Sequence, residues 1–135
     1  MILVAIFLDA SYLLALYNED DVHHKKAMQI ASSLDSNRYG QLVTSDYIFD
    51  EVVSVAMRKI GKSEAKLYGK QIIGSVFIVH ADKGLFDAAL KIFNSSSDPF
   101  SFTDCMSAAI MELAEMDFIA TFDKLFEKLD VTVVS

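Results

Sequence analysis

The feature that most constrains this chain is an apolar run near its start, Ile2 to Leu8, which ends directly at Asp9. The run is far too short to cross a bilayer, which takes about 20 apolar residues. Short runs of branched side chains are typical of a buried strand in a parallel sheet with helices on both faces. Asp9 then lies at the carboxyl end of a strand, where open α/β sheets bind ligands. Because a buried carboxylate is costly without a positive partner, Asp9 is the first candidate for a functional residue.

Length and composition predict a single domain over residues 1–135, and the 53% hydrophobic content favours a sheet that is covered on both faces. No apolar run reaches transmembrane length, and the N-terminus lacks the basic region of a signal peptide. The single cysteine cannot form an internal disulfide, which fits a reducing compartment. We therefore expect a cytoplasmic protein with no membrane partner. The net charge of −7 argues against bulk attraction to nucleic acid.

Hydrophobic periodicity predicts strands and helices in alternation. After the first strand, further strands are expected near 41–44, 76–79, 118–121 and 131–134, and helices near 12–17, 22–34, 46–60, 63–73, 82–93, 103–115 and 123–128. The segment from Asn94 to Ser101 contains the only proline and is predicted to be a loop. Alternation of this kind predicts an α/β fold, a three-layer sandwich with a mainly parallel sheet of about five strands flanked by helices.

Three acidic residues follow predicted strands or begin predicted helices. Asp9 ends the first strand, Asp123 follows the fourth, and Asp104 lies in the first turn of a helix. In a parallel sheet these positions lie at one edge. Carboxylates gathered there repel one another unless a cation lies between them, and hard oxygen ligands suit Mg²⁺ or Mn²⁺. Sites of this kind commonly serve phosphoryl transfer.

Each of these acids also has an ordinary structural explanation. Asp9 is placed to cap the helix behind it, and Asp104 and Asp123 are placed to interact with helix dipoles. The third predicted helix offers Asp50 and Glu51 as a fourth ligand. Both flank the apolar stripe of that helix, so periodicity does not choose between them.

Four sequence fragments together resemble the PIN-domain ribonucleases, the family that includes the toxin components of VapBC toxin–antitoxin pairs. The fragments are Phe7-Leu8-Asp9-Ala10-Ser11, Thr44-Ser45-Asp46-Tyr47-Ile48-Phe49-Asp50-Glu51, Ser101-Phe102-Thr103-Asp104-Cys105 and Ala120-Thr121-Phe122-Asp123-Lys124-Leu125-Phe126. The resemblance covers essentially the whole chain. It implies a PIN-like fold and an acidic quartet of Asp9, Glu51, Asp104 and Asp123, and so it selects Glu51 over Asp50.

In such proteins the acids hold Mg²⁺ or Mn²⁺ and cleave single-stranded RNA by metal-activated water. The resemblance also implies a homodimer and, for a toxin, an antitoxin protein as partner. Around the quartet, Ser11 and Thr103 carry hydroxyls suited to bracing the carboxylates or a metal-bound water. Thr121 is suited to the same role near Asp123, although an ordinary helix cap explains it equally well.

A basic region partly offsets the acidic total. Five of the twelve lysines and arginines lie between positions 58 and 70. Arg58, Lys62, Lys66 and Lys70 are four residues apart and share one helix face if the helix continues through Gly61. This face is either a ridge that contacts RNA phosphates or a solvated surface.

Two other classes of protein remain as alternatives. A phosphatase that forms an aspartyl phosphate would use Asp9 as nucleophile, but it requires a second Asp where Ser11 stands. A non-catalytic PIN-like module for binding or dimerisation would leave the acidic cluster unused and destabilising. Cys105 is expected to be a buried apolar residue, and the three histidines are too scattered to suggest a zinc site.

Overall fold

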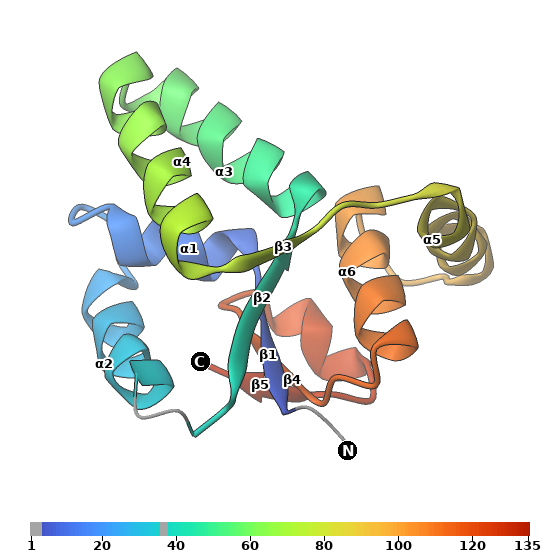
Figure 1. Cartoon of the computed structure of the whole chain (residues 1–135). Coiled ribbons are helices and arrows are strands. Elements are labelled where there is room, and N and C mark those ends of the chain that lie inside the picture. The colour runs from blue at the N-terminus through green and yellow to red at the C-terminus, as the bar shows by residue number, and fades with distance from the viewer. Residues whose placement is uncertain (1–3, 36–37) are drawn as a thin grey trace.

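The computed structural model describes residues 4–35 and 38–135, and its centre is a parallel sheet of five strands (Figure 1). The strands are β1 (Ala5–Leu8), β2 (Gln41–Ser45), β3 (Phe77–Val79), β4 (Phe118–Ala120) and β5 (Thr132–Val134), in the order β3-β2-β1-β4-β5. Every neighbouring pair is parallel. β1 therefore lies in the middle, between β2 and β4. Ile2 and Leu3 of the predicted first strand lie outside the described residues.

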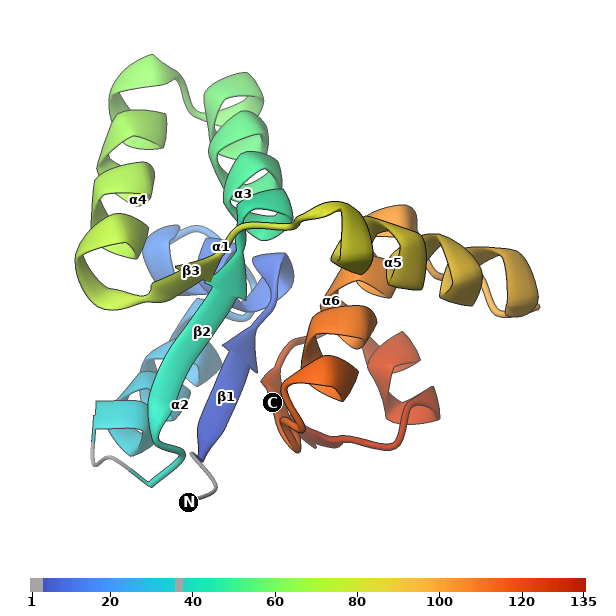
Figure 2. The ribbon, with the colours of Figure 1, turned by 45° about the vertical axis from the view of Figure 1, so that its right-hand side comes forward.

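Helices cover both faces of the sheet, so the predicted three-layer α/β fold is confirmed. α1 (Ala10–Tyr17) and α2 (His24–Asp35) lie on one face, and α5 (Lys83–Ser95) and α6 (Phe102–Leu113) lie on the other (Figure 1). α3 (Asp46–Lys59) and α4 (Lys62–Ser75) form a hairpin that extends beyond the strand ends, with α3 on the side nearer α6 (Figure 2). A short 3₁₀ helix, η1 (Lys124–Lys128), follows β4.

The core explains why β1 is apolar along its whole length. Ile6, Phe7 and Leu8 are consecutive and at most 2% exposed, because helices cover both faces of the strand. Full burial of each such side chain contributes roughly 1.5–3 kcal/mol. β1 is thus a fixed support for the residue that follows it, Asp9.

Several predicted boundaries were wrong, and the larger differences are at helix ends. Ile60 and Leu113 were placed in apolar stripes but are 43% and 66% exposed, since each stands where its helix leaves the core. α4 continues through Gly74, which was expected to end it, and α5 extends past Asn94 into the predicted loop. Within the described residues, no helix has the length and apolar character needed to span a membrane.

Candidate active site

The strand order creates a crevice at the carboxyl ends of β1 and β4. The chain leaves β1 toward β2 and β3, and then crosses through α5 and α6 to β4 on the other side of β1. Ligands bind open α/β sheets at such a switch point. The Asp9 N–H donates to the carbonyl of Ala120 at 3.0 Å, so the pairing of these strands continues up to Asp9. Residues just after both strands therefore face the crevice.

One pocket of about 220 Å³ at this place is lined by all four predicted acidic residues. The residues that contribute are Asp9 and Ser11 after β1, Glu51 and Val55 from α3, Asp104 from α6, and Asp123 after β4. Segments that are far apart in the sequence thus share one pocket. The four acidic side chains therefore do not point into separate, solvent-exposed parts of the surface.

Asp9 is buried, with 5% of its surface exposed, and is held by two hydroxyl groups. Thr121 Oγ1 donates to Asp9 Oδ2 at 2.7 Å, and Ser11 Oγ donates to the same oxygen at 3.1 Å. Each hydroxyl oxygen also accepts a backbone N–H, from Asp123 at 3.0 Å and from Phe122 at 2.9 Å respectively. The Asp9 side chain makes no cap hydrogen bond to α1. Helix capping therefore does not explain the position of the Asp9 side chain.

Asp104 belongs to a capping box at the start of α6. The Asp104 N–H donates to Ser101 Oγ at 3.0 Å, and Asp104 Oδ2 accepts the Ser101 N–H at 2.9 Å. This arrangement fixes one carboxylate oxygen of Asp104 through the helix terminus. The structural explanation and a place in the acidic pocket therefore both apply to Asp104.

Glu51 and Asp50 have different surroundings. Glu51 lines the acidic pocket, whereas Asp50 lines only an adjoining cavity and accepts a hydrogen bond from Ser54 at 3.2 Å. Asp123 lines the acidic pocket at its rim and caps η1, accepting the Leu125 N–H at 3.0 Å. The position of Asp123 is thus also explained by its role as the N-cap of η1.

The acids influence one another electrostatically. Burial raises the pKa of the Asp9 carboxyl, against the hydrogen bonds from Thr121, Ala10 and Ser11, and the charge of Asp104 raises it further. Burial also raises the pKa of Asp104, to which the charge of Asp123 adds. For Glu51 burial is again the largest cause of a raised pKa, followed by the charges of Asp9, Asp104 and Asp50. The pocket is therefore a region of concentrated, partly desolvated negative charge.

The donor set of this pocket suits a hard divalent cation. Carboxylate oxygens are the ligands that Mg²⁺ and Mn²⁺ prefer, and a cation would relieve the mutual repulsion of the acids. In the part of the chain that the structure describes, no three acidic, histidine or cysteine side chains come close enough together to form a finished metal-binding group. The residues fit the ion by their chemistry and their shared pocket.

Comparison with known proteins identifies the family of this chain. The family model described as PIN domain matches residues 6–131. The chain belongs to the PIN-domain family. The resemblance inferred from the four fragments is therefore confirmed.

Two curated relatives of this PIN domain are ribonucleases by name. The chain is 25% identical over 125 residues to the VapC ribonuclease of Archaeoglobus fulgidus, with 91% of this chain and 80% of the relative covered. It is 22% identical over 130 residues to Ribonuclease VapC1 of Aquifex aeolicus, with 96% and 89% covered.

Solved structures share the fold of this PIN domain. Mycobacterium tuberculosis VapC20, described as a sarcin-ricin loop cleaving toxin, superimposes with a TM-score of 0.84 at 23% identity and covers 93% of this chain and 98% of its own. VapBC2 from Rickettsia felis, bound to a DNA fragment from its promoter, gives a TM-score of 0.73 at 10% identity, with 96% and 97% covered.

The predicted supporting hydroxyls of this PIN domain differ in what they contact. Ser11 and Thr121 both hold Asp9, and Thr121 also accepts the Asp123 N–H as an ordinary turn would require. The Thr103 hydroxyl makes no hydrogen bond within residues 4–35 and 38–135, and only its carbonyl is engaged, by Ser107 at 3.2 Å. Thr103 lines the adjoining cavity and braces no carboxylate among the described residues, and its role toward a metal-bound water stays a prediction.

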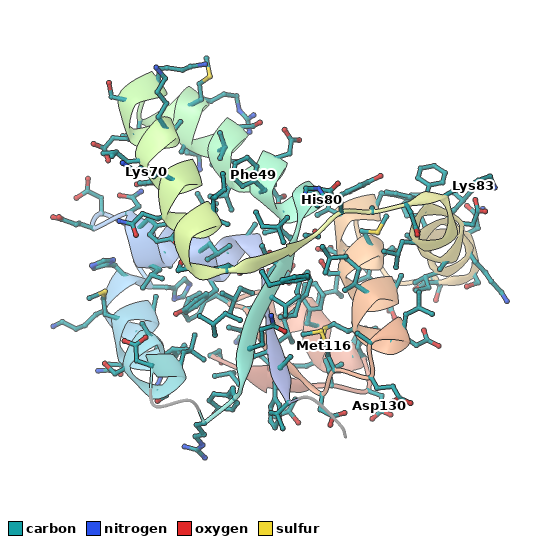
Figure 3. All side chains as sticks on the ribbon, viewed as in Figure 1. Phe49, Lys70, His80, Lys83, Met116 and Asp130 are labelled. Carbon is teal, nitrogen blue, oxygen red and sulfur yellow. The ribbon has the colours of Figure 1, made fainter. Side chains whose placement is uncertain are left out.

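The prediction that Arg58, Lys62 and Lys66 share one helix face is wrong. α3 ends at Lys59, and Gly61, with φ of +123°, begins a new helix in the opposite direction. Lys62 and Lys66 therefore lie on α4, the same helix on which Figure 3 marks Lys70, beyond α3 from the acidic pocket. Arg58 remains close, because it lines a cavity of about 520 Å³ together with Glu51.

Proposed function

We propose that this PIN domain is an endoribonuclease that cleaves single-stranded RNA and depends on Mg²⁺ or Mn²⁺. The observation that carries the proposal is the single pocket shared by Asp9, Glu51, Asp104 and Asp123, in a chain of the PIN-domain family. The names of the two curated relatives, both ribonucleases, support the reaction. In this proposal residues 1–135 act as one domain.

The four acids would hold the cation and orient it toward a phosphodiester. When bound, the cation supplies charge neutralisation at the scissile phosphate and makes a coordinated water more acidic. Ser11 and Thr121 fix the direction of the Asp9 carboxylate, and the capping box fixes that of Asp104. Glu51 and Asp123, which are more exposed, complete the acidic wall of the pocket.

The two alternatives have less support. The residue after Ala10 is Ser11, whose hydroxyl donates to Asp9 Oδ2, and this contact replaces the second Asp that an aspartyl-phosphate enzyme needs. A non-catalytic module would retain a buried Asp9 carboxylate with a raised pKa and no use for it. Mn²⁺ titration separates the binding module from the nuclease, because saturable binding that disappears in Asp9→Asn contradicts an unused cluster.

The deciding experiment is cleavage of a random-sequence pool of single-stranded RNA with added Mn²⁺. Wild type should cut the pool, chelation should stop the reaction, and Asp104→Asn should reduce it by at least about a hundredfold, as expected for loss of a cation ligand. Asp130→Asn is the matched control, because Asp130 is exposed and lines neither the acidic pocket nor the two cavities beside it. Equal activity in wild type and Asp104→Asn would contradict the proposal.

We also propose that the protein works with partners, as a homodimer and as the toxin of a toxin–antitoxin pair. Structural neighbours include VapBC-1 of nontypeable Haemophilus influenzae and a toxin–antitoxin complex of Klebsiella pneumoniae. Large apolar side chains on the outer helices support an interface, for example Leu67 at 53% and Ile73 at 66% exposure. Sedimentation of the purified chain, alone and with a protein encoded beside it, tests both.

A further inference from the structure

A second cavity adjoins the acidic pocket on the side of β4. It has a volume of about 310 Å³ and shares Asp123 with the acidic pocket. Its other walls include His23 and Lys26 beside α1 and α2, and Phe122 and Lys124 after β4. Sequence reasoning gave none of these four residues a role. His23 and Lys26 match no motif, and Phe122 and Lys124 entered only as members of the fragment around Asp123.

An aromatic platform forms one wall of this cavity. The rings of His23 and Phe122 are stacked, with centroids 4.4 Å apart and planes 8° from parallel. Phe122 is half-buried against Tyr12, while His23 is exposed. Stacked rings with an open face are the surfaces on which proteins place unpaired bases.

The platform is fixed relative to the acidic pocket. The Phe122 N–H donates to Ser11 Oγ at 2.9 Å, and the same Ser11 hydroxyl donates to Asp9 Oδ2 at 3.1 Å. Two hydrogen bonds therefore connect the ring-bearing residue to the buried carboxylate. A base on His23 would sit at a set distance from the phosphate that Asp9 faces.

Two lysines supply positive charge beside the platform. Lys26 and Lys124 line the cavity, and neither has a carboxylate within 4.0 Å among the residues that the structure describes. Two acidic side chains, Asp123 and Glu127, line the same cavity, and the Asp123 carboxylate accepts the Leu125 N–H. In a chain of net charge −7, unpaired lysines next to an acidic pocket are placed to contact phosphates.

We propose that this cavity binds a nucleotide of single-stranded RNA next to the scissile phosphate, with its base stacked on His23 and neighbouring phosphates contacted by Lys26 and Lys124. This inference rests on the proposed nuclease function. On the opposite side, the cavity containing Arg58 shares Glu51 and Val55 with the acidic pocket. The three hollows thus adjoin one another in a row, and in this proposal the RNA strand runs from the His23 platform across the acids toward Arg58.

The test measures binding of a fluorescein-labelled, random-sequence 12-nucleotide single-stranded RNA by anisotropy, in the Asp104→Asn background. His23→Ala should raise Kd about tenfold, and His23→Phe should restore it, because the ring rather than the charge makes the stack. Lys26→Ala with Lys124→Ala should weaken binding and reduce the slope of log K against log salt by about 0.7 for each phosphate that the lysines no longer neutralise. Lys25→Ala with Lys91→Ala, exposed lysines outside the cavity, is the matched control.

The outcomes separate this inference from the proposed function. If wild type cleaves the RNA pool with Mn²⁺ but the His23 and lysine variants bind RNA as the control does, the nucleotide cavity is wrong and the nuclease proposal stands. If wild type neither binds nor cleaves RNA, both fail. Circular dichroism of each variant confirms folding, and all of the substituted side chains except that of Asp104 are exposed.

Discussion

At the scale of single residues, Asp9 is an expensive group held in place by its neighbours. A carboxylate buried to this extent is destabilising when ionised, since hydroxyl donors replace only part of its lost hydration. The hydroxyls of Ser11 and Thr121 fix its orientation without neutralising it. The fold therefore keeps a partly desolvated negative charge at the place where a bound cation would neutralise it.

Asp9→Asn should make the metal-free protein more stable at neutral pH. Asn keeps the size and the acceptor oxygen but carries no charge to desolvate. Because the pKa of Asp9 is raised in the folded state above its ordinary 3.8, wild type becomes more stable as the pH falls through that raised value and the carboxyl is protonated. The stability difference between the variant and wild type should thus shrink as the pH falls toward 4.

Urea unfolding in the presence of a chelator, at a series of pH values, measures this difference. Asp50→Asn serves as the control, because Asp50 is exposed and outside the pocket. A difference between Asp9→Asn and wild type that is negative, or that does not change with pH, would contradict the burial of an ionised Asp9.

Tyr12 is a second residue whose burial is costly. Its ring is 1% exposed, its hydroxyl has no hydrogen-bond partner in the described structure, and burial raises its pKa well above the ordinary value. An unsatisfied buried polar group costs about 1–3 kcal/mol. Tyr12→Phe should therefore leave the melting temperature unchanged or raise it. Leu13 is also fully buried, so Leu13→Ala should lower the free energy of unfolding by about 2–5 kcal/mol. This variant shows that the assay detects a loss of stability.

At the scale of elements, the first turn of α6 both ends a loop and positions an acid. The capping box of Ser101 and Asp104 satisfies backbone donors of the helix and holds the Asp104 side chain. The N-cap of α5 is comparable, since Asp82 accepts the Leu85 N–H at 2.9 Å, but it lies away from the acidic pocket. These two caps offer a matched pair of substitutions.

Ser101→Ala and Asp82→Ala should each lower the free energy of unfolding by about 1 kcal/mol, the usual cost of removing an N-cap. Only Ser101→Ala should also weaken Mn²⁺ binding and RNA cleavage, because loss of the bond from the Asp104 N–H to Ser101 Oγ loosens the first turn of α6, which carries Asp104. The bond from the backbone N–H of residue 101 to Asp104 Oδ2 remains in this variant, so the loss should be partial. Thermal unfolding and Mn²⁺ titration of both variants measure the two effects. Equal losses of Mn²⁺ affinity in both variants would show that the effect is on global stability alone.

Elements were predictable from the sequence where a local pattern decides them. β1 and the acid that follows it could be placed because a buried strand and a strand end have clear local signals. The choice of Glu51 over Asp50 depended on how α3 packs against α1 and α6, a tertiary property that periodicity does not contain. The exposure of Ile60 and Leu113 had the same origin, since each lies where its helix leaves the core. The stack of His23 on Phe122 joins opposite ends of the chain and could not be predicted.

At the scale of the whole molecule, the acidic pocket should couple cation binding to stability. Mn²⁺ that binds the folded pocket and not the unfolded chain should stabilise by about 2.7 kcal/mol at a hundred times its Kd. The melting temperature of wild type should thus rise with Mn²⁺ and fall back with a chelator, while that of Asp9→Asn should respond little. An equal rise in the melting temperatures of both proteins would show that Mn²⁺ binds outside the acidic pocket.

The central position of β1 also has a consequence for how the protein is made. β1 and Asp9 are synthesised before β4, so the edge of β1 beside Asp9 stays open until Phe118–Ala120 have been made. Thr121 and Asp123 come still later in the chain, and the Thr121 hydroxyl makes the shorter of the two hydrogen bonds to Asp9. The orientation of Asp9 and the shared acidic pocket therefore form only after β4 has paired with β1, so folding of the later part of the domain completes the pocket.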